Sequence, residues 1–139
     1  MDKFTRIYLS VLGGIALIVL VAILYESPKV GVLNERLENQ IELADYPYRF
    51  RVLEFDDGVA TLSTPRAPNF SAFRALRLLF PALADEPDDS ARLYDAQQEL
   101  ARLQTLAANV VTDDPDVNRI AWKLDERWLR DNDINPDLL

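Results

Sequence analysis

The residues IYLSVLGGIALIVLVAILY, numbered 7–25, decide the architecture of this chain. They include no charged residue, and a helix rising about 1.5 Å per residue reaches roughly 28 Å over this length, close to the hydrocarbon thickness of a bilayer. Backbone amides find no hydrogen-bond partners in lipid, and an α-helix satisfies them internally. The stretch therefore predicts one transmembrane helix, to which the rest of the chain is tethered.

A secretory signal peptide is the alternative interpretation of the same residues. Signal cores usually run about 7 to 15 residues and end at a cleavage site made of small residues. This run is longer, and the bulky Tyr25 precedes its polar exit at Glu26 and Ser27. We therefore expect an uncleaved signal-anchor.

The cations that flank the run indicate its orientation. Lys3, Arg6 and the α-amino group precede it, whereas Lys29 and Arg36 follow it. The positive-inside rule places the side richer in Lys and Arg in the cytoplasm. We expect a short cytoplasmic tail, 1–6, a single pass through the inner (cytoplasmic) membrane, and a C-terminal domain in the periplasm.

The composition narrows the classes of function. The 139 residues include no His and no Cys, which are the commonest general base, thiolate nucleophile and transition-metal ligands. The net charge of −8 disfavours nucleic acid as a partner, because phosphates require a basic surface. We expect no catalytic, cofactor or metal site, and no enzyme activity.

Alternating side chains on both sides of Asp56-Asp57-Gly58 predict a β-hairpin over 48–64. A three-residue loop pairs Leu53 with Thr61 and Val52 with Leu62. One face is then the core face and carries Tyr48, Phe50, Val52, Ala60 and Leu62. The opposite face carries Arg49, Arg51, Thr61 and Ser63, with Leu53, Phe55 and Val59 near the turn.

Apolar residues recur at three- and four-residue steps through the rest of the chain, which is typical of amphipathic helices. They predict a juxtamembrane helix over 26–45 and domain helices over 69–80, 90–111 and 115–130, followed by a flexible tail, 131–139. The helix predicted over 90–111 has the most regular apolar face, which consists of Leu93, Ala96, Leu100, Leu103, Ala107 and Val110. The expected fold is mostly helical α+β: one transmembrane helix, then a small domain, 46–130, with a two-stranded hairpin and three to four helices.

Two apolar patches lie off the expected core faces. Trp122 and Leu129 form one of them, on the helix predicted over 115–130. Leu53, Phe55 and Val59 form the other, on the hairpin. One patch can close against the 26–45 helix and leave the other exposed, or both can be buried internally. Trp122, with Arg119 and Arg130 nearby, has the composition of an interface hot spot, so these five apolar residues are the candidate partner-binding residues.

Five arginines gather in residues 46–81, and they are candidates for a weak anion-binding site: Arg49, Arg51, Arg66, Arg74 and Arg77. The alternative is that they pair with carboxylates of the acidic second half. Helix capping is the expected role of Asp88, Asp89, Asp113 and Asp114.

These patterns favour a protein-binding accessory or assembly subunit of a membrane or envelope complex. Its partners are then the membrane, through 7–25, and other membrane or envelope proteins. A membrane-anchored domain that senses a small ligand or a lipid is the alternative. An enzyme using only carboxylates and arginines is the third hypothesis.

Overall fold

The computed structural model describes residues 2–24 and 28–139. Tyr25, Glu26 and Ser27, where the predicted membrane helix meets the next predicted helix, and Met1 of the predicted tail lie outside the described residues. Within them the chain is α+β, with an N-terminal apolar helix, three strands and five further α-helices. The elements in chain order are α1 Lys3–Leu24, α2 Pro28–Glu38, α3 Ile41–Ala44, β1 Val52–Asp56, β2 Val59–Thr64, α4 Ala72–Leu79, η1 Pro81–Leu83, α5 Ala91–Thr112, β3 Arg119–Leu124, α6 Glu126–Asp131 and η2 Pro136–Leu138.

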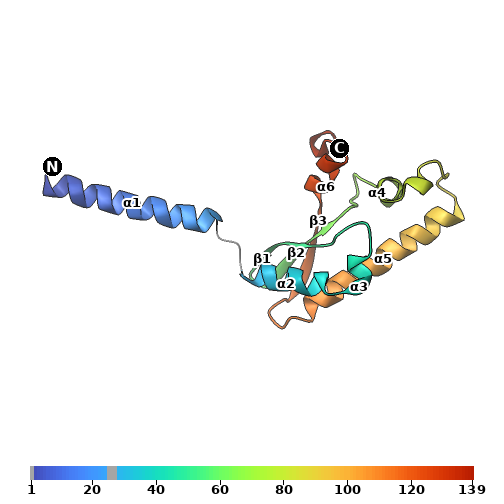
Figure 1. Ribbon diagram of the computed structural model, residues 1–139, viewed down its shortest axis with the longest axis horizontal. Coiled ribbons are helices and arrows are strands. Elements are labelled where there is room, and N and C mark those ends of the chain that lie inside the picture. Colours follow the sequence, from blue (N-terminus) through green and yellow to red (C-terminus); the bar gives the residue numbers. More distant parts are fainter. Residues whose placement is uncertain (1, 25–27) are drawn as a thin grey trace.

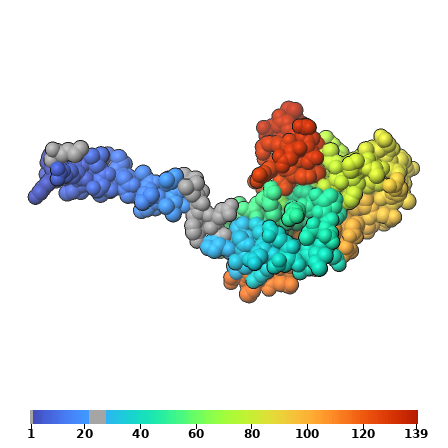
Figure 2. All heavy atoms as spheres, viewed as in Figure 1, coloured from blue at the N-terminus to red at the C-terminus, as the bar shows by residue number. Residues whose placement is uncertain are grey.

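The first helix, α1, stands clear of the other elements in Figures 1 and 2. The segment Lys3–Val21 is long and apolar enough to cross a membrane, and none of it is buried inside the protein. A signal sequence near the N-terminus passes the same test of length and composition. The predicted apolar helix is therefore confirmed.

The sheet has the order β1-β2-β3, with β1 and β2 antiparallel and β2 and β3 parallel. Helices α2 and α5 pack against each other, α2 packs on β1, and α5 packs on β2 and β3. One continuous core fills the space between these helices and the sheet. Figure 1 shows the long α5, in yellow and orange, returning the chain to the start of β3.

The predicted core face of the hairpin is confirmed: Tyr48, Phe50, Val52, Ala60 and Leu62 are all buried. The predicted three-residue loop is wrong, because Asp56 pairs with Val59 across a two-residue turn in which Asp57 and Gly58 both have positive φ. A bulge between Val52 and Glu54 then restores the predicted pairing of Val52 with Leu62, so Leu53 has no partner across the strand. The predicted pairing of Leu53 with Thr61 is wrong for the same reason.

The predicted helix over 26–45 is two helices rather than one. Chain direction changes at Asn39 and Gln40, between α2 and α3. Leu33 and Leu37 of α2 are buried, whereas Ile41, which the four-residue spacing would place on the same face, is 76% exposed and Leu43 is buried. The break rotates the apolar face, so the periodicity of α2 does not continue into α3.

The helices predicted over 69–80 and 90–111 correspond to α4 and α5. Ser71 caps α4 and Ser90 caps α5, each by accepting a hydrogen bond from the backbone N–H three residues on. The apolar seam of α5 faces the core, where Leu93, Leu100 and Leu103 are at most 1% exposed. Ala96 and Val110 are partly buried against the same core.

The helix predicted over 115–130 is wrong. Residues Arg119–Leu124 form β3, which pairs with the whole of β2, and only the residues after Asp125 form the short helix α6. The order of the sheet places β2 between β1 and β3 and leaves β3 at one edge. The predicted flexible tail, 131–139, contains η2, and its Ile134 packs against a second small core around Phe70, Ala75 and Leu129.

Candidate protein-binding site

The outer edge of β3 carries backbone groups that point away from the sheet. Arg119 donates its N–H to Gly58, and Asp125 donates its N–H to Thr64, so the odd-numbered residues of β3 face β2. Ile120, Trp122 and Leu124 consequently direct their N–H and C=O groups outward. Within residues 2–24 and 28–139 these outward groups make no hydrogen bond to backbone or side chain.

The opposite edge of the sheet is closed at the corresponding level. The Asn34 side chain, on α2, accepts a hydrogen bond from the Val52 N–H at 2.6 Å and donates one to the Val52 carbonyl at 3.0 Å. One amide side chain thus takes the place of a neighbouring strand. Lys29 and Arg36, on either side of Asn34 in the same helix, both contact the buried Asp114 at 2.9 Å and fix α2 to the turn before β3.

Trp122 occupies the middle of the open edge and is 41% exposed. Its ring lies edge-on to Phe50, with 6.4 Å between the centroids. Phe50 in turn contacts Tyr48, and Tyr48 contacts Trp128, in further edge-to-face pairs. A row of aromatic rings therefore holds an exposed side chain in place from within the core, which limits the conformational entropy that binding removes.

A hollow of about 150 Å³ lies between β1, the end of β3 and the start of α6, and we call it the Leu53 hollow. Leu53, the bulge residue of β1, is 37% exposed there. Its rim carries the cations Arg51, Lys123 and Arg127. The full lining is Arg51, Leu53, Lys123, Leu124, Asp125, Glu126 and Arg127.

The buried carboxylate in this hollow, Asp125, makes hydrogen bonds within the protein. Asp125 is 4% exposed and accepts hydrogen bonds from the Tyr48 hydroxyl at 2.8 Å, from Arg51 at 3.1 Å and from the Trp128 N–H at 3.1 Å. Burial beside this carboxylate raises the pKa of Tyr48 far above its ordinary value. The cap of α6 and the anchor of the 48–51 segment are thus one residue, which the sequence analysis did not single out.

The other predicted partner-binding residues are placed differently. Leu129 is completely buried in the second core and offers no surface to a partner, so its prediction as a surface residue is wrong. Phe55 is half-buried and packs on the main core, because the two-residue turn moves it to the face that carries Ala60. Val59 is half-buried beside the turn. Of the five, Trp122 and Leu53 are the most exposed.

The five candidate anion-binding arginines are not gathered into one site. Arg51 pairs with Asp125 and Arg77 with Asp88, as the carboxylate-pairing alternative expects. Arg66 donates to the Gln104 side chain, and Arg74 lies over the Phe70 ring at 4.5 Å. Arg49 is exposed, and in the part of the chain that the structure describes it has no ion pair.

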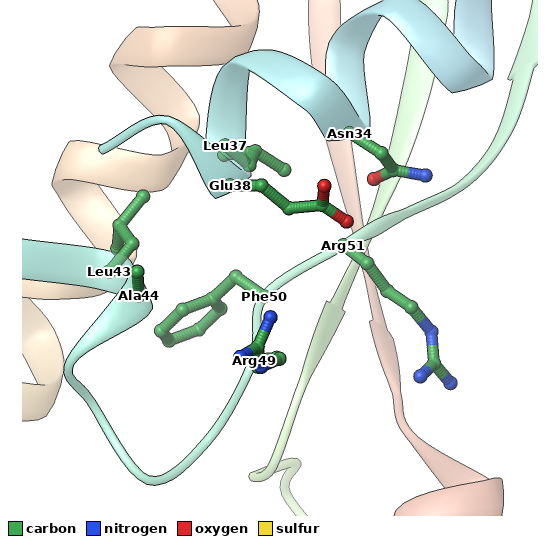
Figure 3. A pocket seen from close by; sticks show the side chains of 8 residues that line it. All are labelled: Asn34, Leu37, Glu38, Leu43, Ala44, Arg49, Phe50 and Arg51. Atoms are coloured by element: carbon green, nitrogen blue, oxygen red, sulfur yellow. The ribbon is translucent and has the colours of Figure 1, made fainter. Parts of the chain in front are cut away.

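A cleft of about 240 Å³ lies between α2, α3 and the 49–51 segment. Figure 3 shows Phe50 pointing towards Leu43 and Ala44, with Glu38 above the strand and Arg51 extending the other way. Arg49 and Arg51 are the cations that line the cleft, but Arg51 forms an ion pair with Asp125. Asn34, which also lines the cleft, is hydrogen-bonded to Val52. The cleft is smaller than typical ligand pockets, which begin at about 300 Å³.

The acidic turns contain no metal site and one internal ion-pair cluster. Within the described residues no group of three or more acidic side chains is arranged to hold a metal ion. Asp114, expected to cap a helix, instead binds Lys29 and Arg36. The Asp116 N–H and the Lys29 ammonium hold the pKa of Asp114 below its ordinary value. Asp88 pairs with Arg77 rather than capping α5.

Comparison with models of protein families, with curated proteins and with solved structures found no match for this chain.

Proposed function

We propose that this chain is a single-pass membrane protein whose small domain binds other proteins, as an accessory or assembly subunit of a membrane or envelope complex. The observation that carries the proposal is that the β3 edge is open and has the exposed Trp122 at its centre. Edge strands are normally covered, shortened or bulged, because their unpaired N–H and C=O groups invite another chain. Here Asn34 bonds the N–H and C=O of Val52 at the β1 edge, whereas the outward groups at the same level of β3, beside Trp122, have no partner among the described residues.

The membrane part of the proposal rests on α1. An apolar helix that packs on no other element gains nothing from water, and insertion into lipid removes its exposed apolar surface. With Lys3 and Arg6 before the helix, the N-terminus is cytoplasmic and the domain lies in the periplasm. A reporter fused after Leu139 should be active only on the exported side, and the intact mass should retain residues 1–25. A cytoplasmic reporter contradicts the orientation, and a mature chain that begins near Glu26 contradicts the anchor.

Partner binding is tested by co-purification in mild detergent from the organism that makes the protein. Trp122→Ala should abolish recovery of the partners, because exposed Trp side chains dominate interface energies. Tyr94→Ala is the matched control, since Tyr94 is an exposed aromatic residue, 60% exposed, on α5. Equal recovery with both variants would contradict a binding role for Trp122, provided that both domains melt like the unmodified chain.

A further inference from the structure

The β3 edge has the geometry that accepts an added strand. Ile120, Trp122 and Leu124 each present a backbone N–H and a C=O to the same side, and strand addition uses such groups as its main source of affinity. We propose that this edge binds an extended, acidic segment of a partner protein by β-strand addition. The proposal rests on the protein-binding function proposed above and names the chemistry of the partner.

Charge at the edge favours an acidic segment. Arg119 and Lys123 are exposed on one face of β3, and Arg127 follows on α6. Among the described residues none of these three cations takes part in an ion pair, whereas Arg51, Arg77 and Arg92 all do. A strand paired with β3 brings its side chains to about 5 Å from those of its neighbour, where opposite charges stabilise the pair.

The other face of β3 favours apolar side chains. Ile120, Trp122 and Leu124 alternate with the cations along the strand and share the face that carries Leu62. Trp122 is held edge-on against Phe50 and still leaves 41% of its surface free. A strand that satisfies both faces alternates acidic and apolar residues, with the acidic side chains beside Arg119 and Lys123.

The charge of the whole chain makes this edge selective. With a net charge of −8, most of the surface repels an acidic segment. Exposed charges act over about 8 Å at physiological salt, so Arg119, Lys123 and Arg127 attract an acidic segment locally. Glu126, their acidic neighbour in the Leu53 hollow, contacts Arg130 at 3.5 Å.

A second copy of the chain is the competing occupant. Antiparallel pairing about Trp122 places Lys123 opposite Ala121 and joins no like charges, whereas pairing about Ala121 places Arg119 opposite Lys123, and pairing about Lys123 places it opposite itself. Like charges in these positions are destabilising.

The direct test uses the full chain in non-ionic detergent micelles and a blocked heptapeptide in which Glu alternates with Val. Residue-resolved amide exchange should show new protection at Ile120, Trp122 and Leu124, with no change at Val52. Two control peptides, one with Lys in place of Glu and one with the same Glu and Val residues grouped in blocks, should give no protection. Equal protection by the Lys peptide, or none by the alternating Glu peptide, would overturn the proposal. Protection of these amides without peptide, with concentration-dependent dimerisation, would also overturn it.

Two matched pairs of variants separate the backbone from the side chains. Trp122→Thr keeps the outward N–H and should weaken peptide binding about fivefold to thirtyfold, whereas Trp122→Pro also removes the donor and should abolish it. Lys123→Gln should weaken binding about twofold to fivefold, and Arg49→Gln, the same charge change beyond the opposite edge, should have no effect. Equal binding by Trp122→Thr and Trp122→Pro would show that the strand edge is not used.

The two proposals fail in different ways. If Trp122→Ala abolishes co-purification while the Glu peptide leaves the β3 amides unprotected, the protein-binding function stands and strand addition is wrong. If Trp122→Ala leaves co-purification intact, the protein-binding role of this edge fails as well.

Discussion

The two edges of the sheet differ in how their outward backbone groups are satisfied. At β1, the Asn34 amide bonds both the N–H and the C=O of Val52, and α2 covers the strand. At β3, the outward groups of Ile120, Trp122 and Leu124 have no such partner within the described residues. Natural sheets usually cover or shorten their edges, so the open edge at β3 is the feature on which the proposed binding rests.

Phe50 connects the two edges, and its loss should have the largest effect. It is 5% exposed, lines the cleft beside α2, and contacts Trp122 on the far strand. Phe50→Ala should lower the free energy of unfolding by about 3 to 5 kcal/mol, because it leaves a cavity in the core. Arg49→Ala, one residue away and exposed, should change it by less than about 0.5 kcal/mol. Similar losses in chemical denaturation would mean that the observed faces of the hairpin are wrong.

Asn34→Ala should open the closed edge. It removes both hydrogen bonds to Val52, and an unsatisfied buried backbone group costs about 1 to 3 kcal/mol. The variant should also self-associate, because the β1 edge becomes available to another chain. Denaturation and sedimentation measure the two effects. Asn39→Ala, an exposed Asn just after α2, is the control, and equal behaviour of both variants would contradict the capping role of Asn34.

Acid should loosen the same edge through α2. The Asp116 N–H and Lys29 hold the pKa of Asp114 below its ordinary value of 3.8, so the unfolded chain binds this proton more readily than the folded one. The contribution of Asp114 to stability is therefore fully present above about pH 4 and is lost as the pH falls through the folded pKa. Exchange at Val52 should accelerate in this range. Asp114→Asn should lack that pH dependence, and an unchanged profile would contradict the role of Asp114.

The two tryptophans should differ in their contribution to stability, with the smallest effect at the open edge. Trp128 connects the main core to the second core and contacts Tyr48 and Phe70. Trp128→Ala should cost about 3 kcal/mol, whereas Trp122→Ala should cost about 1 kcal/mol or less, because Trp122 is 41% exposed. Thermal denaturation compares them. A Trp122 variant that unfolds would place Trp122 in the core and remove the binding surface.

The elements predicted from local patterns are the ones that short-range periodicity determines. The α5 seam and the core face of the hairpin follow from periods of 3.6 and 2 residues, and both are confirmed. The position of Leu53 was not predictable in this way, because a two-residue turn and a bulge replace the three-residue loop and still pair Val52 with Leu62. The alternating pattern predicts the pairing of Val52 with Leu62, but a three-residue loop and a two-residue turn with a bulge both produce that pairing.

The error at β3 has a different cause. Ile120, Leu124 and Trp128 are spaced like one face of a helix, while Ile120, Trp122 and Leu124 alternate like a strand. Pairing with β2, sixty residues earlier, decides between them, and no short window along the sequence includes both strands. The same error moves the candidate site: the helical spacing places Trp122 on a helix, whereas the open edge around it exists only because the segment is a strand. Partner binding by Trp122 stays a prediction.

Amide hydrogen exchange of the free chain, in micelles and at low concentration, tests the central claim most directly. We expect slow exchange at Val52, whose N–H is bonded to Asn34, and fast exchange at Ile120, Trp122 and Leu124, with slow exchange at Ala121 and Lys123 between them. Slow exchange at all of Ile120, Trp122 and Leu124 would mean that the β3 edge is already covered, and would contradict the account.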